Sequence, residues 1–183
     1  MNHIPSELLK LVAEGNESAF EKLYHFFYDC LFRFAMHIVK NEMLSEEIVS
    51  DVLLNIWQKR KKLPSIGDID SYLFTSVKNK ALHYIDKENR RPKREELSVT
   101  IEYIQDDSDP ESTMINDELN KILTDAIESL PEKCRIIFKL AREDEFKYKK
   151  ISKILGISVK TIDAQMRIAK QKIEEALKKY DSL

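Results

Sequence analysis

The sequence contains little of the material from which turns and sheets are built. Among its 183 residues there are 3 glycines and 5 prolines, whereas sheet proteins use such residues in many short turns. It also has only 2 cysteines, Cys30 and Cys134, and both stand in apolar runs. We therefore expect a mostly helical protein whose cysteines are reduced core residues and form no disulfide.

Segments that cross or target membranes are also missing. No apolar run comes near the roughly 20 residues that a membrane-spanning helix needs. The first residues, MNHIPSELLK, do not have the layout of a signal peptide. We therefore expect a soluble, cytoplasmic protein.

Catalytic and cofactor-binding motifs are equally scarce. The sequence has no glycine-rich phosphate-binding loop, and its cysteines and histidines lack the spacing of zinc ligands. The 4 histidines are dispersed, and we find no set of nucleophile, base and carboxylate. We expect no enzymatic activity, no cofactor and no metal site.

What the sequence does have is charge that is sorted along the chain. The formal net charge is only -2, yet basic and acidic residues gather in different segments. From Glu95 to Glu118 there are 9 acids and no Lys or Arg. This segment includes QDDSDPES, which has nothing to bury, so residues 95–118 are predicted to link two domains.

After this linker, residues 146–172 have the pattern of a helix-turn-helix. Residues 147–155 carry apolar side chains at helical spacing, Gly156 suits the left-handed conformation that ends a helix, and Ser158 can cap the next helix. Between Lys147 and Lys172 there are 8 basic residues and 1 acid. A lysine-rich surface hairpin is the simpler reading, but the combined pattern favours a DNA reader whose second helix enters a major groove.

Other amphipathic helices are predicted on both sides of the linker. Their expected starting points are Pro5, Glu17 after a cap at Asn16, a cap at Ser45, Asp68 or Asp70, a position near Asp117, and Pro131. The last two helices are expected to supply the core against which the helix-turn-helix packs. The predicted fold is therefore all-α, with an N-terminal helical bundle and a C-terminal helix-turn-helix domain joined by an acidic linker.

The end of the N-terminal bundle is rich in basic and aromatic residues. From Lys59 to Arg94 there are 11 basic residues and 4 acids. Aromatic residues are interleaved with them, namely Tyr72, Phe74 and Tyr84. Basic side chains beside exposed rings are typical of proteins that bind single-stranded nucleic acid. The alternative is that the rings belong to the bundle core and the lysines are merely solvated.

Three segments, in this order, resemble those of one family. LSEEIVSDVLLNIWQKR resembles its polymerase-binding helix, and SYLFTSVKNKALHYIDKENRR resembles the helix that opens and reads the downstream promoter element. Residues 129–173 resemble the domain that reads the upstream element. The family is that of the bacterial sigma factors of the extracytoplasmic-function (ECF) type, the two-domain members of the sigma-seventy family. The resemblance covers about Ser18 to Leu177.

The resemblance implies a function and its partners. It implies that the protein binds core RNA polymerase, directs it to promoter DNA and helps to melt that DNA. It divides the chain into a region 2 domain over 1–94, the linker over 95–118 and a region 4 domain over 119–183. The ending IDAQMRIAKQKI is most similar to sigma factors of the Bacteroidetes group, many of which are held by a membrane-spanning partner. A membrane-associated anti-sigma factor is therefore expected.

The resemblance also assigns site residues by position. Polymerase contacts fall on Asp51, Leu54, Trp57 and Arg60, although Trp57 suits an apolar core equally well. Contacts to the downstream element fall on Tyr72, Lys78, Asn79, Lys80 and His83. Contacts to the upstream element fall on Ser158, Lys160, Thr161, Ala164 and Arg167.

Two other classes of function stay open on the residues alone. A stand-alone repressor or activator would bind duplex DNA without polymerase, but it needs neither the basic and aromatic segment nor a long acidic linker. A helical adaptor that binds no nucleic acid is the other class. Loss of DNA binding on addition of salt would separate the DNA-binding classes from the adaptor.

Overall fold

The computed structural model describes residues 4–89 and 113–180, and the regular elements in these ranges are all helical. They are α1 (Ser6–Ala13), α2 (Glu17–Val39), α3 (Glu42–Gln58), the 3-10 helix η1 (Arg60–Ser65), α4 (Ile69–Asn89), α5 (Thr113–Glu128), α6 (Glu132–Arg142), α7 (Tyr148–Leu155) and α8 (Val159–Tyr180). The prediction of an all-α fold is confirmed.

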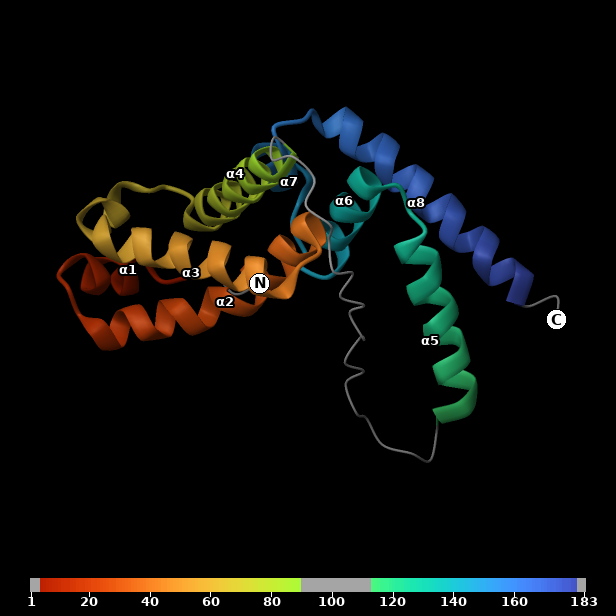
Figure 1. Ribbon diagram of the computed structural model, residues 1–183, viewed down its shortest axis with the longest axis horizontal. Coiled ribbons are helices and arrows are strands. Elements are labelled where there is room, and N and C mark those ends of the chain that lie inside the picture. Colours follow the sequence, from red (N-terminus) through yellow and green to blue (C-terminus); the bar gives the residue numbers. More distant parts are fainter. Residues whose placement is uncertain (1–3, 90–112, 181–183) are drawn as a thin grey trace.

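The N-terminal region is a bundle in which α2 packs against both α3 and α4, with α1 and η1 packed together beside them (Figure 1). Its helix starts follow local capping chemistry. The Asn16 side chain accepts a hydrogen bond from the Ala19 amide at 2.9 Å, and Asp68 accepts one from the Ser71 amide at 3.1 Å. The sequence predicted the cap at Asn16 and left the second start open between Asp68 and Asp70, because Asn and Asp side chains accept from the amides that the first turn leaves unpaired.

The predicted start of α3 is wrong. The helix begins at Glu42, and the cap is Asn41, whose side chain accepts from the Leu44 amide at 2.9 Å. Ser45 lies inside the helix, is fully buried, and donates its hydroxyl to the Asn41 carbonyl at 2.7 Å. Asn41 is as good a cap as Ser45 and stands one turn earlier, so the helix gains a turn by starting there.

The C-terminal region consists of α5 to α8, and α8 packs against each of the other three. Here α5 begins at Thr113, earlier than the predicted start near Asp117 and inside the predicted linker. The rest of that linker, residues 95–112, lies outside the described residues. A small buried cluster of Leu130, Cys134 and Ala169 lies within this region.

The two regions share one apolar core, which the sequence did not predict. Phe146, Ile151 and Ile154 of the C-terminal region belong to the same buried cluster as Phe34 and Phe74 of the bundle. The helices in contact are α4 with α7 and α2 with α6. The two predicted helical domains therefore pack against each other in this structure.

The cysteines are free and buried, as predicted. Burial raises the pKa of the Cys30 thiol to about 12, as expected for an unreactive core thiol. None of the described helices is long and apolar enough to cross a membrane.

Candidate nucleic-acid interface

The turn between α7 and α8 is built from local interactions. Gly156 ends α7 with a φ of 71°, in the left-handed region that favours glycine. The Ser152 hydroxyl donates to the Ile157 carbonyl at 2.6 Å and so closes the turn. Ser158 then caps α8, because its hydroxyl accepts from the Thr161 amide at 3.0 Å. The predicted helix-turn-helix geometry is confirmed.

The start of α8 presents polar side chains to solvent. Ile162 and Ala169 are fully buried against the rest of the C-terminal region. On the opposite side, Lys160, Thr161 and Arg167 are exposed. Of the other predicted upstream contacts, Ser158 is exposed and Ala164 is half-buried. A surface of this kind is free to enter a DNA groove without any rearrangement of α8.

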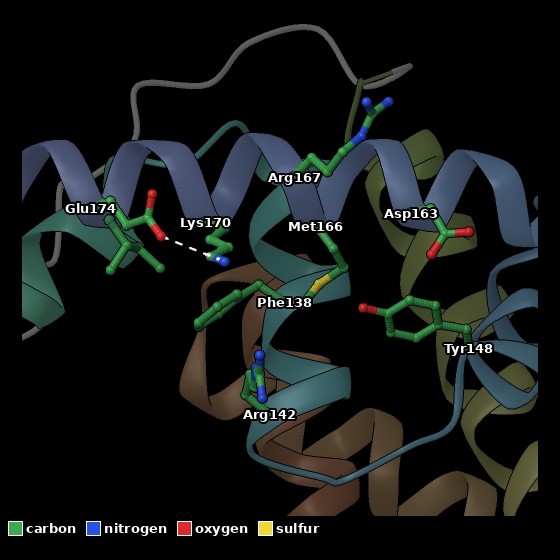
Figure 2. Close-up of a pocket in the computed structure, with 9 residues that line it drawn as sticks. Phe138, Arg142, Tyr148, Asp163, Met166, Arg167, Lys170 and Glu174 are labelled. Carbon is green, nitrogen blue, oxygen red and sulfur yellow. Dashed lines mark ion pairs between the residues drawn. The ribbon is translucent and has the colours of Figure 1, made fainter.

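A groove of about 620 Å³ runs beside α8, between that helix, α6 and the start of α7. Figure 2 shows Phe138 and Met166 at its centre and Arg167 extending from α8 away from them. Arg142 and Tyr148 line it too, and neither was selected from the sequence. Arg142 stands at the end of α6, outside the basic run that marked the helix-turn-helix, so no sequence signal pointed to it.

On α4, some of the predicted downstream contacts are exposed, and others already bind other residues of the protein. Tyr72 is 40% exposed, and Asn79 and His83 are exposed as well. Lys78 and Lys80 are half-buried. The Lys78 ammonium donates to the Ile154 carbonyl of α7 at 2.8 Å, and Lys80 pairs with Asp51 of α3.

The aromatic residues of this segment do not act as one stacking surface. Phe74 is fully buried, so the core interpretation is right for this ring. Tyr84 is half-buried and donates its hydroxyl to Glu47 of α3, which raises the pKa of Tyr84 to about 12. Tyr72 remains the exposed ring among the three. A ring that is to stack on a base must be exposed, and among these three Tyr72 meets this condition.

The predicted polymerase contacts lie along α3 and at the start of η1. Leu54 is 52% exposed. Trp57 is half-buried between Phe20, with ring centroids 4.9 Å apart, and the Arg60 guanidinium, 4.5 Å above its ring. Asp51 is joined to Lys80, which brings a predicted polymerase contact and a predicted DNA contact into one ion pair.

Further charged pairs join the N-terminal and C-terminal regions, and none of them was predicted. Lys150 of α7 pairs with Asp70, and Lys153 lies 3.7 Å from Asp68. These pairs link residues that are far apart in sequence, so a single sequence carries no signal for them.

A second group of charges lies where α2 meets the segment between α6 and α7. Arg33 lies 3.9 Å from Asp144, and His37 lies 3.8 Å from Glu143. Burial raises the pKa of Asp144 to about 6, although the Arg33 charge opposes this. The His37 side chain holds the pKa of Glu143 below its ordinary value.

Within the described ranges, no group of three or more His, Cys, Asp or Glu side chains is placed to hold a metal ion. The features that stand out are two helices with basic, partly exposed faces.

Comparison with known families gives two matches along the chain. The profile of sigma-70 region 2 matches residues 23–91, and that of sigma-70 region 4 matches residues 120–173. Together they cover about two thirds of the chain.

Curated relatives match over nearly the whole length. The ECF RNA polymerase sigma-E factor of Haemophilus influenzae is 22% identical over 177 residues, which cover 93% of each chain. The ECF RNA polymerase sigma factor SigK of Mycobacterium bovis is 23% identical over 176 residues, covering 93% of this chain and 91% of the relative.

Two solved structures share the fold. CnrH, solved in complex with the cytosolic domain of CnrY, has a TM-score of 0.61 at 18% identity, covering 94% of this chain and 96% of CnrH. The sigma factor RpoE of Bartonella quintana was solved in complex with the anti-sigma factor NepR. It has a TM-score of 0.60 at 20% identity, covering 87% of this chain and 96% of RpoE.

Proposed function

This chain belongs to the sigma-70 family as an ECF-type RNA polymerase sigma factor, and we propose that it divides promoter recognition between α8 and α4. It binds core RNA polymerase and promoter DNA and directs transcription initiation. Sigma factors are initiation factors and not enzymes. The proposed domains are region 2 over 1–94, a linker over 95–118 whose last residues already form the start of α5, and region 4 over 119–183.

The upstream element is read by α8. The observation that carries this proposal is the exposure of Lys160, Thr161 and Arg167 opposite the buried Ile162 and Ala169. Side chains of this type pair with base edges and phosphates in the major groove. Ser158 and Ala164 border the same surface and complete the proposed contact.

The downstream element is read by α4, with Tyr72, Asn79 and His83 supplying the exposed contacts. Lys78 and Lys80 are proposed to bind the phosphates of the melted strand once their present partners release them. An extruded base needs a ring or a pocket to receive it, and the exposed Tyr72 suits that purpose.

Core polymerase is bound by the exposed side of α3 and by the start of η1. We assign this contact to Asp51, Leu54, Trp57 and Arg60. The 52% exposure of Leu54, on a helix whose other large apolar side chains are mostly buried, supports a protein partner on this face.

The protein is further proposed to act in the cytoplasm and to be held by a membrane-associated anti-sigma factor. Of the two similar solved structures, RpoE is a sigma factor bound to the anti-sigma factor NepR, and CnrH is bound to the cytosolic domain of CnrY. The C-terminal residues 162–173 support an origin among sigma factors of the Bacteroidetes type.

Run-off transcription with purified core polymerase tests this function. Genomic promoter fragments are transcribed with and without the protein, and promoter-specific transcripts are expected only when both protein and polymerase are present. Binding of duplex fragments by the protein alone is measured in parallel. Tight, sequence-specific binding without polymerase would instead identify a stand-alone repressor or activator.

A further inference from the structure

The first helix of the helix-turn-helix, α7, packs along α4, the proposed downstream reader (Figure 1). The contact has an apolar centre. The rings of Phe74 and Phe146 meet edge to face with centroids 4.8 Å apart, and Ile151 and Ile154 are fully buried. The surface is therefore a packed interface and not a loose approach of two helices.

Two carboxylates at the start of α4 hold two lysines of α7. Asp70 pairs with Lys150, and these side chains are only 16% and 21% exposed. Asp68 lies 3.7 Å from Lys153. Burial acts to raise the pKa of Asp68, but the Ser71 hydrogen bonds and the two lysines outweigh it and lower that pKa. The carboxylates thus occupy lysines that belong to the basic face of the helix-turn-helix.

The reverse contact uses a lysine of α4. The Lys78 ammonium donates to the Ile154 carbonyl in the last turn of α7, at 2.8 Å. A cation is favoured there, because the last carbonyls of a helix carry its partial negative charge. One interface therefore engages basic residues of both proposed DNA-reading elements.

The geometry points to self-inhibition of DNA binding, with Asp68 and Asp70 occupying the positions of DNA phosphates. In the closed arrangement the carboxylates hold Lys150 and Lys153, and α7 covers the Lys78 side of α4. DNA phosphates compete with the carboxylates for these lysines, so full binding requires α4 and α7 to separate. This inference rests on the proposed function and adds a regulation of its DNA-binding surfaces.

The test removes one carboxylate without disturbing a helix start. In Asp70→Asn the amide keeps the shape of the side chain but loses the charge that holds Lys150. Asp68 is less suitable, because it also caps α4. The matched control is Glu7→Gln, which makes the same change of charge at an exposed carboxylate that pairs with Lys10 inside α1. A conservative variant, Asp70→Glu, keeps the charge.

Three measurements are made on the full chain. They are the affinity of the free protein for promoter fragments carrying a premelted bubble, amide hydrogen exchange in α4 and α7, and run-off transcription with core polymerase. Asp70→Asn is expected to bind DNA on the order of fivefold more tightly and to exchange faster in α7, because a larger fraction of the protein is open. Glu7→Gln and Asp70→Glu are expected to match the wild type.

The outcomes separate this inference from the proposed function. If Asp70→Asn behaves like Glu7→Gln in affinity and exchange, the proposed self-inhibition is refuted. The proposed function is still supported in that case, provided that the wild-type protein gives polymerase-dependent transcripts. If exchange rises but affinity does not, the contact is structural and inhibits nothing. If the wild type gives no polymerase-dependent transcript, the proposed function fails, and the inhibition of it fails too, whatever the exchange shows.

Discussion

The two proposed DNA-reading helices, α4 and α8, differ in where their neighbours come from. Each is amphipathic, with a buried side formed by Leu73, Val77 and Ala81 in α4 and by Ile162 and Ala169 in α8. The main contacts of α8 are with helices of the C-terminal region, whereas α4 contacts α2 and α3 of its own region and also α7.

This difference decides which lysines are free to bind DNA. The start of α8 stays exposed because the packing of its own region leaves that side free. On α4, the additional neighbour lies on the side of Lys78 and engages it. The exposure of a reading surface is thus set by tertiary contacts as well as by the amphipathic pattern. The cover on α4 comes from the C-terminal region, so uncovering α4 would require the two regions to separate.

Removing the apolar centre of the α4–α7 contact should give the largest effect. Phe146 is only 5% exposed and packs on Phe74. Phe146→Ala is expected to lower the free energy of unfolding by about 3 kcal/mol or more, since it leaves a cavity in the shared core. The measurement is urea unfolding, with amide hydrogen exchange to show whether α4 becomes uncovered.

Phe138→Ala is the matched control for this change. Phe138 is half-buried and packs on the small cluster within the C-terminal region. Loss of the Phe138 ring should lower the free energy of unfolding by less than loss of the Phe146 ring. It should leave amide hydrogen exchange in α4 unchanged. Faster exchange in α4 in both variants, or in neither, would show that the Phe146 ring does not hold the cover in place.

The charges that join α2 to the C-terminal region give a prediction for pH. The side chain of Asp144 is 8% exposed, and burial raises its pKa to about 6. The folded state therefore binds this proton more tightly than the unfolded chain does. The resulting stability is fully present below about pH 4 and is lost as the pH rises through about 6. Asp144→Asn should thus be more stable than the wild type at pH 7, by on the order of 2 kcal/mol, with the difference vanishing toward pH 4.

Glu128→Gln is a control in which the change of stability with pH is expected to have the opposite sign. Burial acts to raise the pKa of Glu128, but Lys139, 2.8 Å away, and Arg135 outweigh it and lower that pKa. The stability that this carboxylate contributes is present at neutral pH and is lost as the pH falls through its lowered pKa. Unfolding is followed by urea titration from about pH 3, which is below the ordinary pKa of a glutamate, to about pH 8. Parallel curves for Asp144→Asn and the wild type would contradict the buried charge.

The features that could be predicted from the sequence are the local ones. Gly156, Ser158 and Asn16 end or cap helices through contacts within a few residues, and each was placed correctly. The start of α3 was missed because Asn41 and Ser45 are both good caps, and propensity alone does not choose between them.

The α4–α7 contact could not be predicted, because its partners lie on opposite sides of the linker. Any of several lysines would suit Asp70, and only the fold selects Lys150. The predicted site residues on α8 needed no such information, since an exposed helix start is a local property. The predicted site residues on α4 did need information on tertiary contacts, because Lys78 and Lys80 already have partners in this structure.

Loss of single basic side chains should sharpen the comparison between the two readers. Arg167→Ala is expected to weaken binding of the upstream element by about tenfold, within the roughly 1–3 kcal/mol of a good base contact, and to leave polymerase binding intact. Lys78→Ala should not weaken duplex binding by the free protein, and it should reduce the melted complex formed with polymerase. Fluorescence anisotropy measures the first, and reactivity of unpaired thymines measures the second.

Lys10→Ala is the control for both changes, because Lys10 is an exposed basic residue of α1 that pairs with Glu7. It should not alter either complex. Equal loss of polymerase binding in Arg167→Ala would contradict the assignment of α8 to DNA. Weaker duplex binding by free Lys78→Ala would contradict the view that α7 already engages this lysine.

The smallest expected effect concerns the cap of α8, where stability and binding can be separated. Ser158→Ala removes the acceptor of the Thr161 amide and should cost about 1 kcal/mol of stability. Ser158→Asp keeps a capping oxygen, so its unfolding curve should match the wild type, but its negative charge would face the DNA phosphates. Both variants should bind the upstream element less tightly, the first because the reading helix frays and the second because like charges repel. Wild-type binding by the stable Ser158→Asp would place Ser158 away from the DNA backbone, and the proposed contact would then have to begin at Lys160.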